Sequence, residues 1–437
     1  GGIDSPRPAS QRAAAFALTA AMLITLAAPA FAGTWYIENG DITVKASGTE
    51  GKNTVSQGAN QEVEDTNTII TNQKTDTASS HTVTIEAGND KVEVTLKDVN
   101  IDTSSRNNAA VSVTGSGNTT IKLDGDNALK SDTYRSGIAS TGSLTISGGE
   151  NDSLTAQGGS GTDGSGGRGI FSKDLTISGV TVNANGGDGK NGSGGSGITS
   201  LGSLTISGGT VNAAGGDGTN SSDGGDGITN NRGVTISSGG TVTAKGGSGE
   251  DGEDGGDGIR SFDPVAISGG TVTANGGDSK DGYGGDGIHS NGVTISGGTV
   301  NTTGGNGNGG NGGGNGIIGS GRVAISGGTV KAAGGNGNGG NGIINNGIIS
   351  NDIDLSGSLE LTAKAGSPTG KALLQNGREL DLDTIKDKLG PGAKVTTTDA
   401  DGKVKQVSIP RPVEPEEPVI PEESSSSSDG GSATPSA

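Results

Sequence analysis

The chain repeats one short block about every thirty residues, and this periodicity constrains its fold more than any other feature. Eight blocks that resemble Thr-Ile-Ser-Gly-Gly recur at intervals of 28 to 31 residues. Their central apolar residues are Ile146, Ile177, Ile206, Ile236, Ile267, Ile295, Ile325 and Leu355. A repeat of this length is typical of a solenoid, in which each unit is one coil that buries its apolar face only by stacking on its neighbours.

Each unit carries three short strand signals. In the unit from Gly197 to Asp226, the dipeptide Gly197-Ile198 is followed by Ser203–Ile206, by Thr210–Ala213 and then by a run rich in Gly, Asp and Asn. Apolar and polar residues alternate within each signal, and glycines close it where the backbone must turn. Stacking such units predicts continuous inward columns of aliphatic side chains. One column is predicted to contain Ile138, Ile170, Ile198, Ile228, Ile259, Ile288 and Ile317, and another Leu154, Val182, Val211, Val242, Val272, Val300 and Val330.

Composition excludes the competing repeat folds. A helical solenoid is disfavoured because 89 glycines in 437 residues oppose helix formation throughout the chain. A β-propeller needs longer repeats and usually aromatic packing between its blades, whereas aromatic residues make up only 2% of this sequence. The sequence therefore predicts an all-β fold, a right-handed parallel β-helix with about 30 residues per coil and capped ends.

The N-terminal segment resembles an export signal. Residues 1–32 contain an apolar run behind Arg7 and Arg12, and the run leads to the cleavage motif Ala30-Phe31-Ala32. The run is short and rich in alanine, so a cleaved signal peptide is favoured over a membrane anchor, and Gly33 is predicted to begin the mature chain. The chain has no cysteine, so the exported protein must hold its shape without disulfides.

The rest of the chain divides into four predicted regions. Residues 33–135 are interpreted as an N-terminal cap with irregular first coils, and residues 136–365 as the regular repeats. Residues 366–409 are interpreted as a C-terminal cap with a short helix at Leu382–Leu389 and a hairpin at Val395–Val407, since an open solenoid end exposes unpaired strand edges. Residues 410–437 are rich in Pro, Glu and Ser and are predicted to be a disordered linker or stalk.

The loops that follow the third strand signal are acidic. Asp226, Asp257 and Asp286 occupy equivalent positions in successive units, and stacking places them about 4.8 Å apart in one column. Such a column repels itself, by roughly 1 kcal/mol per pair even in water, so a bound cation is expected to stabilise it. Calcium is the natural cofactor outside the cell because it binds carboxylate and carbonyl oxygens. The alternative is that these aspartates are ordinary turn residues in solvated loops.

No catalytic constellation stands out. The chain contains no Asp-Asp dipeptide, and its only histidines are His81 and His289. His289 and Arg260 occupy a position that is threonine in neighbouring units, so both are interpreted as exposed strand residues and no catalytic residue is assigned. Aromatic platforms for sugar rings are scarce, and Tyr283, inside an acidic loop, is the best candidate for ligand stacking. A formal charge of -19 disfavours nucleic acid and anionic membranes as partners.

Three segments resemble a known family. Val92–Asp102, Ile121–Leu129 and Leu144–Gly149, together with the repeated Gly-Asp-Gly-Ile motif, are similar to secreted bacterial β-helix proteins described as carbohydrate-binding domains of the pectate-lyase-like superfamily. The resemblance covers roughly residues 82–361 and implies polysaccharide binding with calcium rather than cleavage. Two departures are the long Gly/Asn inserts and the loss of Asp after Asp286, which place a calcium site beyond Asn315 in doubt.

The expectation from sequence is therefore a secreted or cell-surface bacterial protein that binds a polysaccharide or a host or plant glycan and is not an enzyme. A structural or adhesive surface rod without sugar affinity is the main alternative, followed by a polysaccharide lyase or hydrolase and an autotransporter passenger. Because the repeated block carries no chemistry of its own, this functional expectation depends on analogy.

Overall fold

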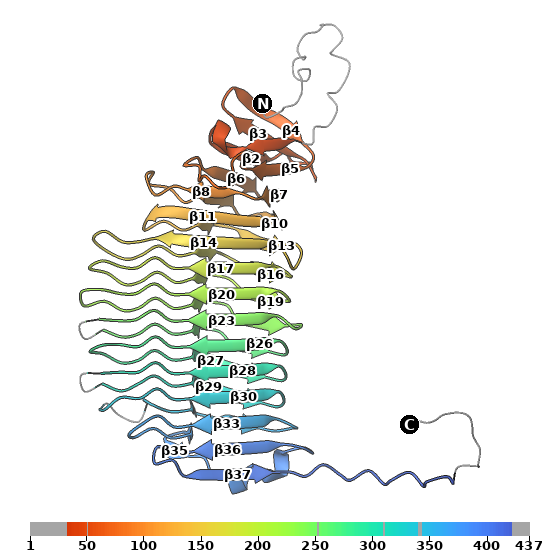
Figure 1. Cartoon of the computed structure of the whole chain (residues 1–437), viewed down its shortest axis with the longest axis vertical. Coiled ribbons are helices and arrows are strands. Elements are labelled where there is room, and N and C mark those ends of the chain that lie inside the picture. The colour runs from red at the N-terminus through yellow and green to blue at the C-terminus, as the bar shows by residue number, and fades with distance from the viewer. Residues whose placement is uncertain (1–32, 50, 251–252, 309–310, 340–342, 422–437) are drawn as a thin grey trace.

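The computed structural model describes residues 33–49, 51–250, 253–308, 311–339 and 343–421. Its coils stack along one axis into an elongated rod, with the N-terminal end of the described chain at one tip and the final hairpin at the other (Figure 1). The fold is an all-β parallel solenoid, which confirms the predicted fold class. The predicted signal peptide, residues 1–32, and the end of the predicted linker lie outside the described residues.

Parallel strands of successive coils form three ladders that run along the rod. The first ladder contains β6 (Val83–Gly88), β9 (Val111–Gly115), β12 (Ile138–Ser140), β15 (Ile170–Ser172), β18 (Ile198–Ser200), β21 (Ile228–Asn230), β24 (Ile259–Ser261), β31 (Ile348–Ser350) and β34 (Leu373–Gln375). The second contains β5 (Thr68–Thr71), β7 (Lys91–Lys97), β10 (Asn118–Asp124), β13 (Ser143–Ser147), β16 (Leu175–Ser178), β19 (Leu204–Ser207), β22 (Val234–Ser237), β25 (Val265–Ile267) and β32 (Ile353–Leu355). Two longer strands, β27 (Ile288–Ile295) and β29 (Ile317–Ile325), take part in both ladders.

The third ladder is a separate sheet that ends in an antiparallel hairpin. It contains β8 (Asn100–Asp102), β11 (Asp126–Thr133), β14 (Ser153–Gly159), β17 (Thr181–Asn185), β20 (Thr210–Ala214), β23 (Thr241–Lys245), β26 (Thr271–Asn275), β28 (Thr299–Thr303), β30 (Thr329–Ala333), β33 (Glu360–Lys364), β36 (Lys394–Thr398) and β37 (Val404–Ser408). The hairpin of β36 and β37 agrees with the predicted turn between them.

The core is the set of aliphatic columns that the repeat predicts. Ile198 pairs with Ile170 and Ile228, and Val211 pairs with Val182 and Val242, so equivalent residues stack in register from coil to coil. Every member of the two predicted columns is fully buried. Because burial of one such side chain contributes roughly 1.5 to 3 kcal/mol, each added coil strengthens the stack.

The N-terminal cap contains antiparallel strand pairs. It consists of β1 (Thr34–Tyr36), a 3-10 turn η1 (Ile37–Asn39), β2 (Ile42–Ala46), β3 (Asn53–Gln57) and β4 (Asn60–Asp65). Strand β2 pairs with β3 in antiparallel fashion and with β6 in parallel fashion, so the cap continues the first ladder.

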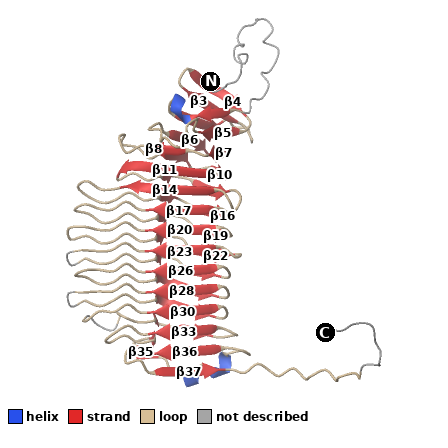
Figure 2. Cartoon of the chain, in the orientation of Figure 1, coloured by secondary structure: helices blue, strands red, loops and turns tan. Residues whose placement is uncertain are grey.

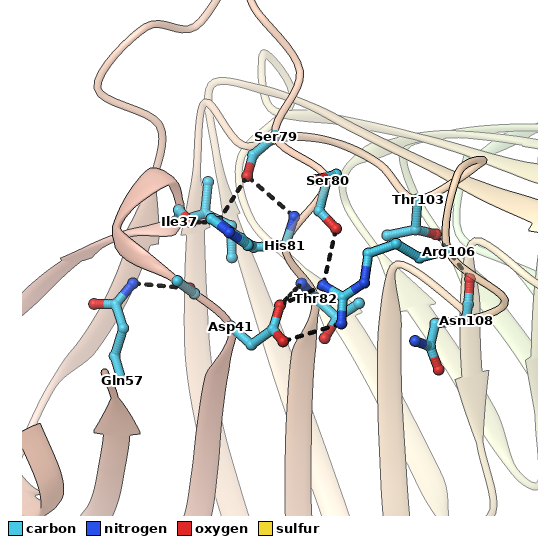
Figure 3. A network of polar contacts seen from close by, with 11 residues as sticks. Ile37, Asp41, Gln57, Ser79, Ser80, His81, Thr82, Thr103, Arg106 and Asn108 are labelled. Atoms are coloured by element: carbon cyan, nitrogen blue, oxygen red, sulfur yellow. Dashed lines mark hydrogen bonds and ion pairs between the residues drawn. The ribbon is translucent and has the colours of Figure 1, made fainter. Parts of the chain in front are cut away.

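One charged pair fastens this cap to the first coils. Arg106 places Nη1 2.6 Å from Asp41 Oδ1 and Nη2 3.1 Å from Oδ2, and Nη1 also donates to the Ser80 carbonyl (Figure 3). The Arg106 guanidinium lowers the pKa of Asp41, and the backbone N–H of Thr82, bonded to the same carboxylate, lowers it further. The cap is therefore joined to residues more than sixty positions later in the chain.

The C-terminal cap contains β35 (Arg378–Glu379) and two 3-10 turns, η2 (Leu382–Thr384) and η3 (Lys386–Lys388). The predicted helix at Leu382–Leu389 is thus wrong in kind, because eight residues are too few to sustain an α-helix without a broad packed face. Residues 410–421 continue as an exposed segment without regular structure. Among the described residues, no helix has the length and apolar character needed to span a bilayer.

Each regular coil sends one loop out from the third ladder and back to the first, and these loops stack in parallel (Figure 2). We call their two halves the glycine arms. The outgoing arms contain Gly186-Gly187, Gly215-Gly216, Gly246-Gly247, Gly276-Gly277, Gly304-Gly305 and Gly334-Gly335, and the returning arms Gly166-Gly167, Gly194-Gly195, Gly224-Gly225, Gly255-Gly256, Gly284-Gly285 and Gly313-Gly314.

Backbone hydrogen bonds connect the glycine arms with one another, so the backbone polar groups of the arms bond to protein rather than to solvent. Gly225 N donates to Gly216 O of its own loop at 2.8 Å, and Gly216 N donates to Gly195 O of the preceding returning arm at 2.8 Å. The next outgoing arm repeats the contact, since Gly247 N donates to Gly225 O at 2.8 Å. The arms therefore form a continuous series of backbone hydrogen bonds across successive coils.

Close approach explains why the arms are glycine. A Cβ atom added to Gly225 would lie 2.2 Å from the carbonyl oxygen of Gly195, and one added to Gly247 would lie 1.9 Å from that of Gly216. No side chain fits at such distances without separating the arms. The sequence predicted that glycine opposes helix formation and closes the strand segments at turns, whereas the structure also uses it to pack backbone against backbone.

Replacing Gly225 with alanine is expected to destabilise the solenoid by about 1 to 3 kcal/mol, the usual cost of overpacking, because the new methyl group forces neighbouring arms apart. Gly292→Ala is the matched control, since the nearest atom to its added Cβ, Pro264 Cγ, is at 3.6 Å. Thermal unfolding followed by circular dichroism measures both. Equal midpoints for the two variants would contradict backbone packing in the arms.

Candidate functional site

An acidic cleft lies where the returning glycine arms meet the outer face of the first ladder. Its volume is about 770 Å³, and its walls come from consecutive coils between Ser193 and Ile344. It contains all four predicted site residues, Asp226, Asp257, Asp286 and Tyr283. The sequence therefore selected residues that the fold brings into one concavity.

The floor of the cleft is a column of three aspartates, which directly follow three successive returning arms. Asp257 N donates to Asp226 Oδ1 at 2.8 Å, and Asp286 N donates to Asp257 Oδ1 at 2.7 Å. Asn315 N continues the series by donating to Asp286 Oδ1 at 2.7 Å. One oxygen of each carboxylate thus accepts the backbone N–H of the equivalent residue in the next coil.

This bonding explains why asparagine replaces aspartate farther along the column. Asn315 Oδ1 accepts from Asn346 N at 3.0 Å, in the same way as the carboxylates before it. An amide oxygen serves this purpose as well as a carboxylate oxygen does. The stacking role therefore requires only an Asp or Asn side chain, and the negative charge of Asp226, Asp257 and Asp286 is an additional property of these three coils.

His289 is the residue that sequence reasoning placed wrongly. It follows the inward Ile288 on β27, so strand alternation turns its side chain outward, toward the acidic column. Its Nδ1 lies 3.2 Å from Asp286 Oδ2 and 3.6 Å from Asp257 Oδ2. The interpretation of His289 as an ordinary exposed strand residue is incorrect, because its ring lies between two carboxylates of adjacent coils.

The preceding coils place other polar groups at the same position. Arg260 Nη1 lies 3.6 Å from Asp257 Oδ2, and the Thr229 hydroxyl donates to Asp226 Oδ2 at 2.8 Å. In each of these coils the partner follows its aspartate by three residues. That fixed offset, repeated with a different residue each time, was the signal in the sequence that identifies this wall of the cleft.

Burial and ion pairing shift the pKa values of the ionisable side chains at the floor of the cleft. Burial raises the pKa of Asp257 to about 7 despite the nearby imidazole, and burial also raises the pKa of Asp226. The contacts with Asp257 and Asp286 raise the pKa of His289 to about 10. At neutral pH the imidazole is therefore a cation held by carboxylates, and this charge relieves part of the repulsion in the column.

The rim is exposed and partly aromatic. Asp254 Oδ1 accepts from Tyr283 N at 3.0 Å, which fixes the backbone that carries the Tyr283 ring. The Tyr283 side chain is 38% exposed, and Phe262, just after β24, is 58% exposed. Burial raises the pKa of Asp254, and the charge of Asp223 raises that of Glu253. The rim thus combines apolar rings with excess negative charge.

The group of possible metal ligands overlaps the predicted calcium site in two of its three residues, Asp257 and Asp286. Asp257, Asp286 and His289 offer ligand atoms that all lie within 4.8 Å of one another, whereas both Asp226 oxygens already accept protein hydrogen bonds. Calcium takes six to eight oxygen ligands, while this group contains an imidazole that bridges the carboxylates as a cation. The geometry therefore fits calcium poorly at Asp226, Asp257 and Asp286.

Calcium is accordingly expected to change the melting temperature of the full chain by less than about 2 °C, since a ligand stabilises a protein only by binding its folded state preferentially. The measurement compares thermal unfolding in excess EDTA with unfolding in millimolar calcium, with magnesium as the control cation. An increase of several degrees that calcium alone produces would restore the calcium site.

The stability of the wild-type protein is expected to fall between pH 7 and pH 10. The pKa of His289 is about 10 in the folded protein against about 6.5 when unfolded, so its contribution is complete below pH 6.5 and disappears as the pH rises through 10. The groups facing it are Asp226, Asp257, Asp286 and Arg260.

His289→Gln removes this dependence, and urea unfolding at several pH values measures it. The ratio of the wild-type to the variant unfolding constant is expected to rise at least tenfold from pH 7 to pH 10, given that one pKa unit corresponds to a factor of ten. Contributions that the two proteins share cancel in the comparison. Parallel pH profiles would show that the imidazole carries no structural charge.

Comparison with known proteins supports the architecture alone. A family model described as a beta helix repeat matches residues 204–228 and 265–292, which include Asp226 and His289. No curated protein and no solved structure matches the chain. The repeat match and the three stacked ladders together make this chain a parallel β-helix protein.

Proposed function

We propose that this protein is exported, acts outside the cell or at its surface, and binds neutral or amino-sugar glycans in the acidic cleft without cleaving them. The observation that carries the proposal is the presence of two exposed aromatic rings, Phe262 and Tyr283, in a cleft whose floor is lined with carboxylates. The export motif before Gly33 and the family resemblance point in the same direction.

The aromatic rings supply apolar surface for sugar faces. Phe262 directly follows β24 of the first ladder and Tyr283 lies in the loop that leads to β27, so the two rings reach the cleft from different segments. A pyranose presents one face of C–H groups, which packs on an aromatic ring in the manner typical of concave ligand sites. Few aromatic residues exist in this chain, and two of the exposed ones line this cleft.

The polar floor supplies hydrogen bonds of both kinds. Carboxylate oxygens of Asp257 and Asp286 accept hydrogen bonds from hydroxyl groups, and charged acceptors form the stronger bonds. The His289 imidazolium and the Arg260 guanidinium donate instead. A ligand with several hydroxyl groups is the class that uses donors and acceptors placed on adjacent coils.

The charge of the cleft restricts the glycan class. Five aspartates line it against two basic side chains, Arg260 and His289. Like charges in such a concavity cost free energy on binding, so uronate polymers are disfavoured, while neutral or cationic sugars are accepted. The proposed ligands are therefore hexose or hexosamine polymers.

One observation favours a second candidate function, hydrolysis of the bound glycan. Burial raises the pKa of Asp257 to about 7, so this carboxyl group can hold or release a proton at neutral pH, as a general acid does. Binding without cleavage remains the leading proposal, because each floor carboxylate already accepts a structural hydrogen bond. The same experiment separates the two.

The test is retention of the full chain on insoluble polysaccharides in EDTA, with neutral glucans, chitin-type polymers and polyuronates as separate arms. Tyr283→Ala and Phe262→Ala are each expected to lower the affinity for the retained polymer about tenfold, which corresponds to roughly 1.4 kcal/mol of lost stacking. Tyr134→Ala is the matched control, since Tyr134 is an exposed tyrosine outside the cleft.

The outcomes discriminate among the candidates. Retention on polyuronates alone would contradict the argument that the negative cleft disfavours uronate polymers. An equal loss of affinity in the Tyr134→Ala variant would contradict the assignment of the cleft as the binding site. Release of new reducing ends from a retained polymer, abolished by Asp257→Asn, would establish a hydrolase. No retention on any polymer favours a structural or adhesive rod.

A further inference from the structure

The first described residue is buried at the start of the N-terminal cap. Gly33 precedes β1, and its backbone nitrogen lies 3.0 Å from Oδ1 of Asp65, to which it donates. Its carbonyl oxygen accepts from Ile69 N at 3.1 Å, as the parallel pairing of β1 and β5 begins. This contact therefore joins the start of the predicted mature chain to a carboxylate 32 residues later.

Asp65 is fully buried and positioned by several donors. Trp35 Nε1 donates to Oδ2 at 2.8 Å, and Asn67 N donates to Oδ1 at 3.0 Å. Burial raises the pKa of Asp65 even though these hydrogen bonds and the one from Gly33 lower it. The donors thus offset the desolvation of the carboxylate only in part, and a positive charge at this location would stabilise the ionised form.

A cleavage motif in the sequence provides a way to place a positive charge beside Asp65. Gly33 follows Ala30-Phe31-Ala32, a cleavage motif for export. Before cleavage the Gly33 nitrogen is a neutral amide with one hydrogen. Hydrolysis of the Ala32–Gly33 bond by an endopeptidase consumes one water, leaves a carboxylate on Ala32 and converts the same nitrogen into an ammonium group with three hydrogens.

We propose that cleavage before Gly33 creates an α-ammonium group that forms a buried ion pair with Asp65, so that the cap reaches its full stability only in the processed protein. The ion pair needs no rearrangement, because the nitrogen already lies within hydrogen-bonding distance of the carboxylate. Export and final folding of the cap are thereby linked through one atom. This inference rests on the proposed export of the protein and is independent of the glycan proposal.

The proposed ion pair lies at a point where it can stabilise the N-terminal cap. Trp35 is fully buried in the same cap and donates to the same carboxylate, and β1 forms the start of the second ladder by pairing with β5. Tightening this corner therefore stabilises the strand pair that closes the N-terminal end of the rod. Trp35 is the only tryptophan in the sequence, so its fluorescence reports on this corner selectively.

The test compares three forms of the chain that differ only at the N-terminus: one that begins with a free Gly33, one that begins with Nα-acetyl-Gly33, and one that retains Ala32 with a free amine. Urea unfolding monitored by Trp35 fluorescence at pH 7 is expected to give a cap unfolding constant about tenfold lower for free Gly33 than for the other two forms. The form with Ala32 controls for net charge, since it has the same charge displaced by one residue.

Two further measurements complete the test. In the Asp65→Asn background the three forms are expected to unfold at the same urea concentration. In the wild-type background, NMR of ¹⁵N-labelled Gly33 is expected to give an α-amino pKa at least one unit above the ordinary value of about 7.7 to 8.0. Because a raised pKa stabilises only the protonated state, the advantage of free Gly33 should disappear as the pH rises through that value.

Equal unfolding of the free and acetylated forms, or an α-amino pKa at its ordinary value, would overturn the inference. Both measurements use Asp65 in place, so they remain decisive if the Asp65→Asn variant does not fold.

Discussion

The structure depends on backbone hydrogen bonding between coils at a fixed spacing. Parallel ladders place each residue beside its counterpart one coil later, so a buried position must be filled by similar side chains in every coil. From Ile138 to Ile317 and from Leu154 to Val330, the two predicted columns satisfy this requirement with isoleucine, valine and leucine alone. The glycine arms satisfy it in another way, since a Cβ atom at Gly225 would lie 2.2 Å from Gly195 O and no side chain fits there.

The same constraint creates the electrostatic problem of the cleft and contributes to its solution. Stacking brings Asp226, Asp257 and Asp286 into one column, where their charges repel. Each carboxylate accepts the N–H of the next residue in the column, which is a dipole directed at the charge. His289 adds a full positive charge between the last two carboxylates. Backbone donors and one imidazole thus offset part of this repulsion.

Sequence reasoning succeeded where a residue property maps directly onto a coil position. Alternation and period predicted the buried columns, the three strands per coil and the hairpin after Lys394, because these depend on local pattern and on stacking alone. Asp257, selected from its repeated position, and Tyr283, selected as an aromatic residue in an acidic loop, lie in the same cleft. Sequence reasoning fails at His289, because a position that varies between coils ordinarily indicates an unconstrained surface residue. In a solenoid, a column that changes from threonine to arginine to histidine can instead give adjacent coils different roles.

The sequence by itself determined the architecture, since the thirty-residue period, the alternating aliphatic residues and the abundance of glycine are compatible with few other folds. Only the tertiary structure decided which polar groups meet. His289 faces Asp257 from an adjacent coil, Asp65 receives the Gly33 nitrogen from 32 residues away, and the glycine arms interlock across coils. The physical reason is that hydrophobic period reports which face of a strand is buried, whereas pairing of charges and hydrogen bonds depends on how each loop returns to the stack.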